Sequence, residues 1–243
     1  NFTRNPDPDL PWDFCVGSWD FFYRIFLSHT FGEENVGLYQ LTFPVFALCI
    51  SFTSAGLETA ISRTVAENNP SINQEASETL CLGLFISCLL SVITMIILQK
   101  KAADLSTALL GDPRCEEILI LLSYALPLSS IHGCIMGYCY GLKQTQIPAV
   151  SQLIEQTARI LSVFCLYRFA IRNGLHADIP IAAAGIAFGE LFSTFYSVRG
   201  LQKSRSDIFR PGFSFSSIRL RFRELVPLSL PLTANRVLLG LLQ

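Results

Sequence analysis

Long uninterrupted apolar runs dominate the pattern of hydrophobic and polar positions along this chain. The runs 36–57, 79–99 and 118–142 contain no Asp, Glu, Lys or Arg. Each one reaches the roughly 20 residues that an α-helix needs to cross about 30 Å of hydrocarbon. Buried helices of soluble proteins are usually shorter. The pattern therefore predicts an all-α membrane protein with several spans.

Taken along the whole chain, the pattern predicts six spans and the start of a seventh. The first is short and carries Asp20 and Arg24; Pro44 is a candidate kink in the second, and Pro127 interrupts the fourth. The predicted spans are about 14–28, 36–60, 79–99, 118–142, 148–167 and 179–198, with the seventh opening at 225.

These spans divide the chain into four parts. We expect a polar N-terminal stretch (1–13), a transmembrane lobe (14–203), a basic cytoplasmic linker (204–224) and the start of a second lobe (225–243). The chain begins without methionine and stops inside an apolar segment, so we expect both ends to be cut.

Composition agrees with a membrane protein and narrows the chemistry. Hydrophobic residues make up 51% and charged residues 15%, against about 25% charged in soluble domains. A net charge of −1 without a long basic run argues against a nucleic-acid partner. The eight cysteines form no CxxC and no cluster with histidine. Because no nucleophile–base pair or phosphate loop appears either, we expect neither an enzyme nor a metal or cofactor site.

Basic residues in the predicted loops indicate the orientation. The loops after spans two, four and six hold nine Lys and Arg, and those after spans one, three and five hold five. Cytoplasmic loops carry the excess of positive charge. The pattern therefore predicts a cytoplasmic N-terminus.

Small residues recur at the spacing that lets membrane helices approach closely. They form two ridges: Gly133, Gly137 and Gly141 on the fourth span, and Gly185, Gly189, Ser193 and Ser197 on the sixth. The ridges predict a packed bundle and identify no function.

Charged residues inside spans are costly and usually face a bundle interior or a cavity. In the fifth span four polar residues at i, i+3, i+4 and i+7 share one face: Gln152, Glu155, Gln156 and Arg159. Glu155 and Arg159 can pair along the helix. Glu58 and Glu190 are candidates for ion coupling, and His132 is interpreted as a packed or hydrogen-bonded residue. The set predicts a hydrated, charged cavity that suits a polar or anionic cargo.

Three sequence motifs, in order, resemble a known family. The first motif is FGEENVGLYQ, followed by FP and SAGLETAISR (31–63). The second begins with GY and GL and continues with IPA, SQLIEQ and Arg159 (137–159). The third is SLPLT with Asn235-Arg236 (229–236). The chain resembles the stage V sporulation protein B-like branch of the polysaccharide-exporter family, in the MATE/MOP flippase superfamily.

The resemblance implies the N-terminal six-helix lobe of a flippase, plus the start of the seventh helix. In such families two lobes move a lipid-linked sugar by alternating access across the bacterial cell membrane; an undecaprenyl-diphosphate-linked sugar is the implied cargo. Arg24, Asn235 and Arg236 become cavity candidates, with Arg24 and Arg236 opening the first and second lobes. We also expect the chain to need the C-terminal lobe that it lacks.

Two alternatives stay open at this point. A cation-coupled multidrug antiporter of the same superfamily would use acidic residues such as Glu58 and Glu190. A non-transporting membrane fragment is the other.

Overall fold

The protein is all α-helical in the residues that the structure, a computed structural model, describes: 23–67, 73–174, 178–204 and 215–241. These contain eight α-helices, one π-helical turn and no strand, and residues 23–31 are helical as well. The helices are α2 (Glu33–Ile50), η1 (Ser51–Ala55), α3 (Gly56–Glu67), α4 (Asn73–Ala108), α5 (Cys115–Ser123), α6 (Ala125–Gly141), α7 (Gln146–Arg172), α8 (Pro180–Ser204) and α9 (Phe215–Leu241). The predicted all-α fold is confirmed.

Some of the sequence predictions fall outside the described residues. These are the polar stretch 1–13, residues 14–22 of the first predicted span and residues 205–214 of the predicted linker.

The second predicted span belongs to a longer helical rod that runs from Glu33 to Glu67. Gly32, with φ 84°, separates this rod from the helix at 23–31, in a backbone region that favours glycine. The α-helix continues through Pro44. The regular hydrogen bonding changes only at Ser51–Ala55, where one π-helical turn joins α2 to α3.

The fourth predicted span is broken just before Pro127, as the proline predicted. Helices α5 and α6 meet at Tyr124 with an angle of 43°. Pro127 is the third residue of α6. Its missing N–H is tolerated there because the first N–H groups of a helix have no intrahelical acceptor.

By length and hydropathy, three helical stretches of the described residues can cross a membrane, or four if α5 and α6 form one span. The three are 33–67, 76–108 and 180–203. Helix α7 is long enough but carries Glu155, Arg159, Arg168 and Arg172. The six-helix count therefore stays a prediction.

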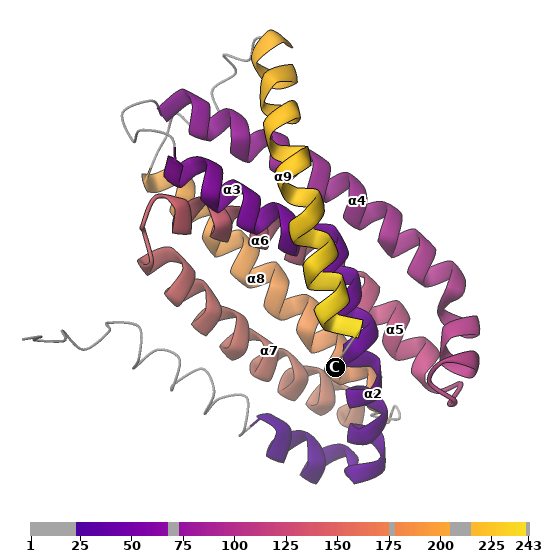
Figure 1. Cartoon of the computed structure of the whole chain (residues 1–243). Helices are drawn as coiled ribbons and strands as arrows, with labels where there is room; N and C mark the ends of the chain where they lie inside the picture. Colours follow the sequence, from indigo (N-terminus) through magenta and orange to yellow (C-terminus); the bar gives the residue numbers. More distant parts are fainter. Residues whose placement is uncertain (1–22, 68–72, 175–177, 205–214, 242–243) are drawn as a thin grey trace, which may run out of the picture.

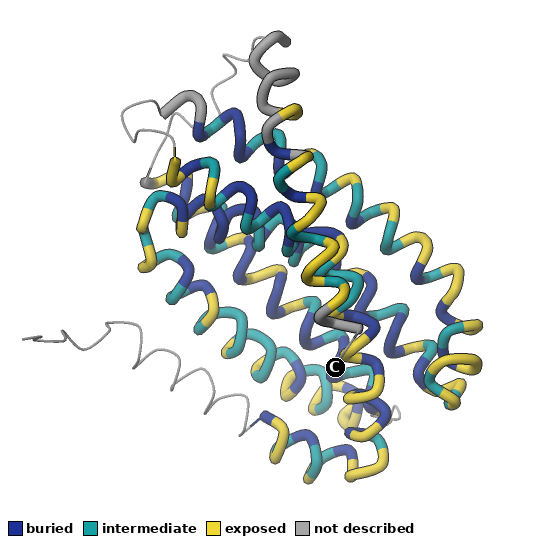
Figure 2. The backbone as a smooth tube through the Cα atoms, in the orientation of Figure 1, coloured by how far each residue is buried: buried dark blue, intermediate teal, exposed yellow. Residues whose placement is uncertain are grey.

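The helices pack as one bundle in which α6 is central. It contacts α3, α4 and α8, while α7 lies along α8 and α9 crosses over α3 (Figure 1). Buried positions concentrate on the faces that meet inside the bundle (Figure 2). The fully buried Tyr138 of α6 packs there with Ile61 and Leu80.

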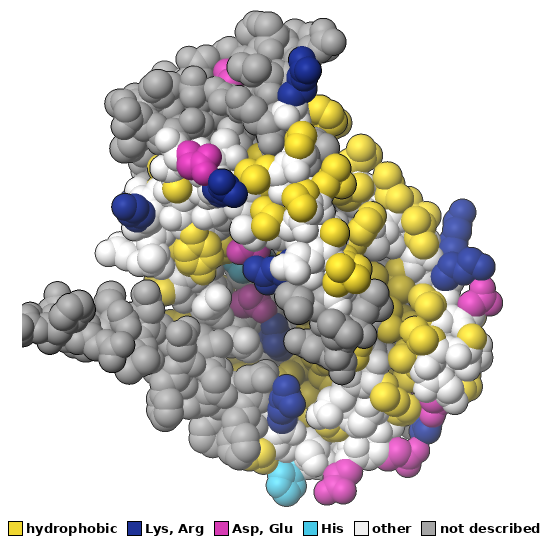
Figure 3. Space-filling view, in the orientation of Figure 1, with side chains coloured by type: hydrophobic (Ala, Val, Ile, Leu, Met, Phe, Trp, Pro, Cys, Tyr) yellow, Lys and Arg dark blue, Asp and Glu magenta, His cyan; other side chains and the backbone are white. Residues whose placement is uncertain are grey.

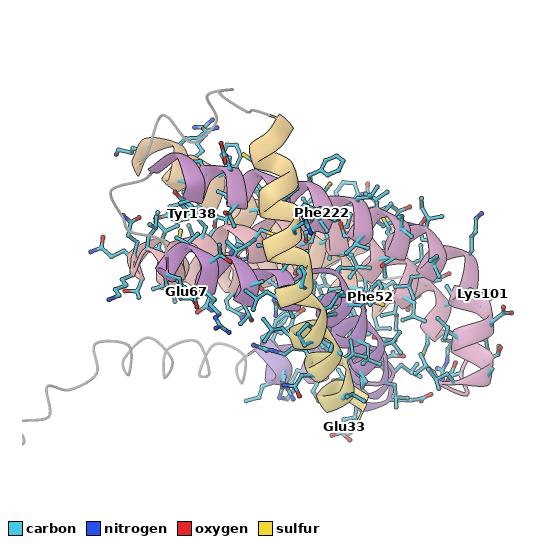
Figure 4. All side chains as sticks on the ribbon, turned by 45° about the horizontal axis from the view of Figure 1, so that its top comes forward. Glu33, Phe52, Glu67, Lys101, Tyr138 and Phe222 are labelled. Atoms are coloured by element: carbon cyan, nitrogen blue, oxygen red, sulfur yellow. The ribbon has the colours of Figure 1, made fainter. Side chains whose placement is uncertain are left out.

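The outer surface suits lipid along its length and water at its ends. Phe52 and Phe222 are exposed along the bundle. The exposed charged residues Glu67 and Lys101 lie at its opposite ends (Figure 4). This distribution of side chains is typical of a multi-pass membrane protein.

The two predicted small-residue ridges lie at close helix contacts, as expected. A Cβ added to Gly137 would lie 3.0 Å from Cα of Glu58 and closer still to its carbonyl oxygen. One added to Gly141 would lie 2.7 Å from the Ser62 carbonyl oxygen, and one at Gly189 would lie 2.9 Å from that of Glu155. These glycines let α3 approach α6, and α7 approach α8, at backbone distance.

Ion pairs of Arg114 stabilise the turn between α4 and α5. Arg114 donates to both carboxylate oxygens of Asp112 and, at 2.8 Å, to Glu34 at the start of α2. Hydrogen bonds from Arg114 hold the pKa of Asp112 below its usual value. The turn thereby ties the end of α4 to the beginning of α2.

Candidate functional site

The charged face predicted on the fifth span is turned into the bundle. Glu155 and Arg159 lie one turn apart on α7, and the Arg159 guanidinium pairs directly with the Glu155 carboxylate. Their side chains are 16% and 12% exposed. The predicted pairing along the helix is confirmed, and it stabilises both charges in an environment poor in water.

Arg159 also reaches a cavity of about 430 Å³ between α7, α2 and the helix at 23–31. Arg24 lines the same cavity, so two of the sequence-predicted residues meet there. Tyr23 and Tyr39 lie on its wall and within electrostatic range of Arg159. The cavity thus combines two guanidinium groups with phenol rings, a lining suited to an anionic or sugar-bearing ligand.

On its other side the Glu155–Arg159 pair borders a buried cluster on α6 and α8. His132 Nδ1 lies 3.4 Å from Glu190 Oε2, and His132 Nε2 lies 3.2 Å from Ser151 Oγ. His132 and Glu190 are 7% and 8% exposed. Glu190 points inward, as its position among small residues predicted.

Glu58 extends the charged side chains toward α9. It lies within electrostatic range of both His132 and Arg236. Figure 3 shows acidic, basic and histidine side chains gathered in a hollow between α7 and α9, with apolar side chains over α4 and α9 beside them. Charged groups therefore cross the interior from the helix at 23–31 to α9.

The remaining predicted site residues lie at the margins of this arrangement. Gln152 is exposed one turn before Glu155, and Gln156 is half-buried with its Oε1 accepting no hydrogen bond among the described residues. Asn235 and Arg236 are exposed on α9. The structure brings Arg24 and Arg159 to one cavity, pairs Arg159 with Glu155, and places Glu58 within electrostatic range of Arg236.

Sequence reasoning missed the position of His132 in this cluster. The two glycine ridges do not meet, since the one on α6 packs on α3 and the one on α8 packs on α7. His132 and Glu190 meet instead where α6 packs on α8, a contact that no spacing in the sequence indicates. His132, Glu155 and Glu190 have potential ligand atoms within 4.8 Å of one another. The Arg159 guanidinium on Glu155 disfavours a metal ion there, because it already neutralises that carboxylate.

Apolar helices around an interior line of charges define a multi-pass membrane protein with a polar core. Sequence comparison gives its family: residues 18–243 match the family described as polysaccharide biosynthesis protein. The chain belongs to this family.

Curated relatives come from Bacillus subtilis (strain 168). Stage V sporulation protein B is 29% identical over 219 residues, 89% of this chain and 42% of the relative. Lipid II flippase MurJ is 24% identical over 182 residues, 71% of the chain and 33% of the relative. Uncharacterized membrane protein YabM is 22% identical over 169 residues, 70% of the chain and 31% of the relative. The chain thus spans less than half the length of these relatives. No solved structure gives a significant match.

Proposed function

We propose that this chain forms one lobe of a flippase for a lipid-linked oligosaccharide or peptidoglycan precursor. The observation that carries the proposal is the cavity lined by Arg24 and Arg159 inside an apolar helical bundle. Arginine presents a fixed fork of donors that matches phosphate oxygens in pairs. An undecaprenyl-diphosphate-linked sugar combines such an anionic head with a lipid tail.

The names of the relatives and of the family support the same proposed function. One of them is named a lipid II flippase, and the family is described by polysaccharide biosynthesis. Because the chain spans less than half of each relative, we propose that the working transporter contains a second helical lobe. Alternating access between the lobes would expose the cavity to one side of the bacterial cytoplasmic membrane at a time.

A cation-coupled multidrug antiporter fits this cavity less well. Arg24 adds a positive charge to this cavity, where Arg159 is paired with Glu155. A positive charge repels a cationic drug, whereas it attracts a diphosphate. The half-buried Glu58 and the buried Glu190 do not line the arginine-lined cavity, so they are compatible with either cargo.

The test is a flipping assay with the complete transporter in vesicles that hold a fluorescent undecaprenyl-diphosphate-linked sugar. A membrane-impermeant quencher reports how much label has moved to the outer leaflet. Arg24→Ala and Arg236→Ala each remove a charged hydrogen-bond donor, and Glu155→Ala removes the carboxylate that accepts from Arg159. Each variant should slow flipping, at a cost on the order of tenfold or more. Lys101→Ala, on the exposed end of α4, is the matched control and should flip at the parental rate.

Flipping at the parental rate by all three variants would overturn the assignment. An absence of flipping by the parent itself would favour a non-transporting membrane protein.

A further inference from the structure

Two buried groups beside the arginine-lined cavity have no part in binding a diphosphate. They are His132 of α6 and Glu190 of α8, joined by the 3.4 Å contact from Nδ1 to Oε2. We propose that this pair is a proton-binding site, and that its proton is the coupling ion of the transporter. The coupling role rests on the proposed function, whereas the proton site itself does not.

The contacts of His132 favour one placement of its protons. The Ser151 hydroxyl has one proton, and Oγ lies 2.8 Å from the Pro148 carbonyl oxygen, which can only accept. With that proton donated to Pro148, Ser151 Oγ accepts from His132 Nε2 at 3.2 Å. In this arrangement Nε2 carries the proton, and Nδ1 of a neutral ring is left with a bare lone pair.

That lone pair faces the Glu190 carboxylate. Glu190 Oε2 is buried and accepts no well-formed hydrogen bond among the described residues. Without a further proton, two acceptors would face each other in a site almost closed to water, which is costly. One proton placed between Nδ1 and Oε2 removes the conflict, whichever atom holds it. The pair then changes from a net charge of −1 to zero, and no other bond is made or broken.

The charged groups at and around this pair have a net charge of −1, which one bound positive charge would neutralise. Toward this pair α7 contributes Glu155 and Arg159, α3 contributes Glu58, and α9 contributes Arg236. With Glu190, the described part of this cluster has three carboxylates and two guanidinium groups. One bound proton brings the net charge of this cluster to zero, whereas a divalent metal ion would make it positive.

Proton binding here would also affect helix packing. The pair joins α6 to α8, and α8 packs along α7, which carries Arg159 to the cavity. A bound proton makes the contact between α6 and α8 attractive, and its release makes the contact repulsive. A ligand or ion that favours one of two arrangements shifts their populations, so the proton can bias the arrangement of the helix that carries the cavity arginine.

The proton site can be tested without any cargo. The chain has three histidines, so His29→Gln with His176→Gln leaves His132 as the only imidazole. Nitrogen-15 NMR of this variant in lipid vesicles, titrated with pH, should find Nε2 protonated throughout and Nδ1 changing between protonated and bare forms. Adding Glu190→Gln, whose amide can donate to Nδ1, should fix Nδ1 as an acceptor and abolish the change. Glu117→Gln, exposed on α5, is the control.

A neutral ring with its proton on Nδ1 and a bare Nε2 at every pH would overturn the proposal, since Ser151 would then be the donor. Zinc binding that disappears in Glu190→Gln would overturn it in favour of a metal site.

The coupling role needs the vesicle assay with an imposed pH gradient. The parent should flip cargo faster with the gradient than without it. Glu190→Gln and His132→Asn should lose this difference and still flip cargo at the rate seen without a gradient. A gradient response that survives in both variants would exclude this pair as the coupling site. Failure of the parent to flip any cargo would count against the proposed function and leave the NMR result standing.

Discussion

At the scale of single residues, the Glu155–Arg159 pair shows how the bundle holds charge in its interior. Each side chain neutralises the other where little water is available. Removing one partner leaves an uncompensated buried charge, which typically costs about 3–5 kcal/mol, whereas removing both leaves none.

We therefore expect Arg159→Gln alone to lower the free energy of unfolding by about 3–5 kcal/mol. The double variant Glu155→Gln with Arg159→Gln should recover a large part of that loss. Unfolding of the purified protein in detergent, followed by circular dichroism, measures both. If the double variant is less stable than Arg159→Gln by a full second penalty, the two residues act independently and the pairing argument fails.

At the scale of helices, the glycine ridges set how closely neighbouring helices approach. Gly137 faces the backbone of Glu58, while Gly37 of α2 has no atom within 4 Å of an added Cβ. The two glycines are therefore a matched pair, since both are helical and only one lies in a tight contact.

Gly137→Ala should lower the free energy of unfolding by about 1–3 kcal/mol, because an extra methyl group forces α3 and α6 apart. Gly37→Ala should be neutral or stabilising by up to about 1 kcal/mol, because alanine is the better helix former. Thermal unfolding in detergent compares the two variants. Equal tolerance of both substitutions would show that the ridge does not limit the packing of α3 on α6.

Periodicity predicted much of this architecture. A helix has a fixed repeat, so the shared face of Glu155 and Arg159 and the glycine ridges follow from residue spacing alone. The repeat does not say which helix covers which part of a face. Gln152 shares a face with Glu155 yet is exposed, because covering it depends on a neighbouring helix.

Contacts between distant segments were beyond the reach of sequence patterns. The pairing of His132 with Glu190 depends on how α6 crosses α8, and the π-helical turn at Ser51–Ala55 depends on local packing around α2 and α3. Pro44 is a signal for a kink, but the α-helix continues through it, and the irregular turn of this rod lies at η1. Pro127 is a signal for the break at Tyr124, because a proline clashes with the carbonyl group of residue i−4, here Ser123.

At the scale of the whole molecule, the remaining question is which end of the bundle faces the cytoplasm. Basic residues are retained on the cytoplasmic side of membrane proteins, and they are more frequent in the loops after the second, fourth and sixth predicted spans. Glu67 follows the second span and Lys101 the third, and they lie at opposite ends of the bundle (Figure 4). Both side chains are well exposed, 63% and 64%, so a reagent can reach either.

We expect Lys101→Cys to react with a membrane-impermeant maleimide in intact cells, and Glu67→Cys to react only after the membrane is opened. Both substitutions are made in a protein whose native cysteines are replaced by alanine, and this parent serves as the unlabelled control. The reverse labelling would place the basic loops outside the cell and overturn the predicted orientation. Because the two sites lie at opposite ends of one bundle, labelling of both in intact cells would mean that the bundle does not span the membrane in the way its apolar surface predicts.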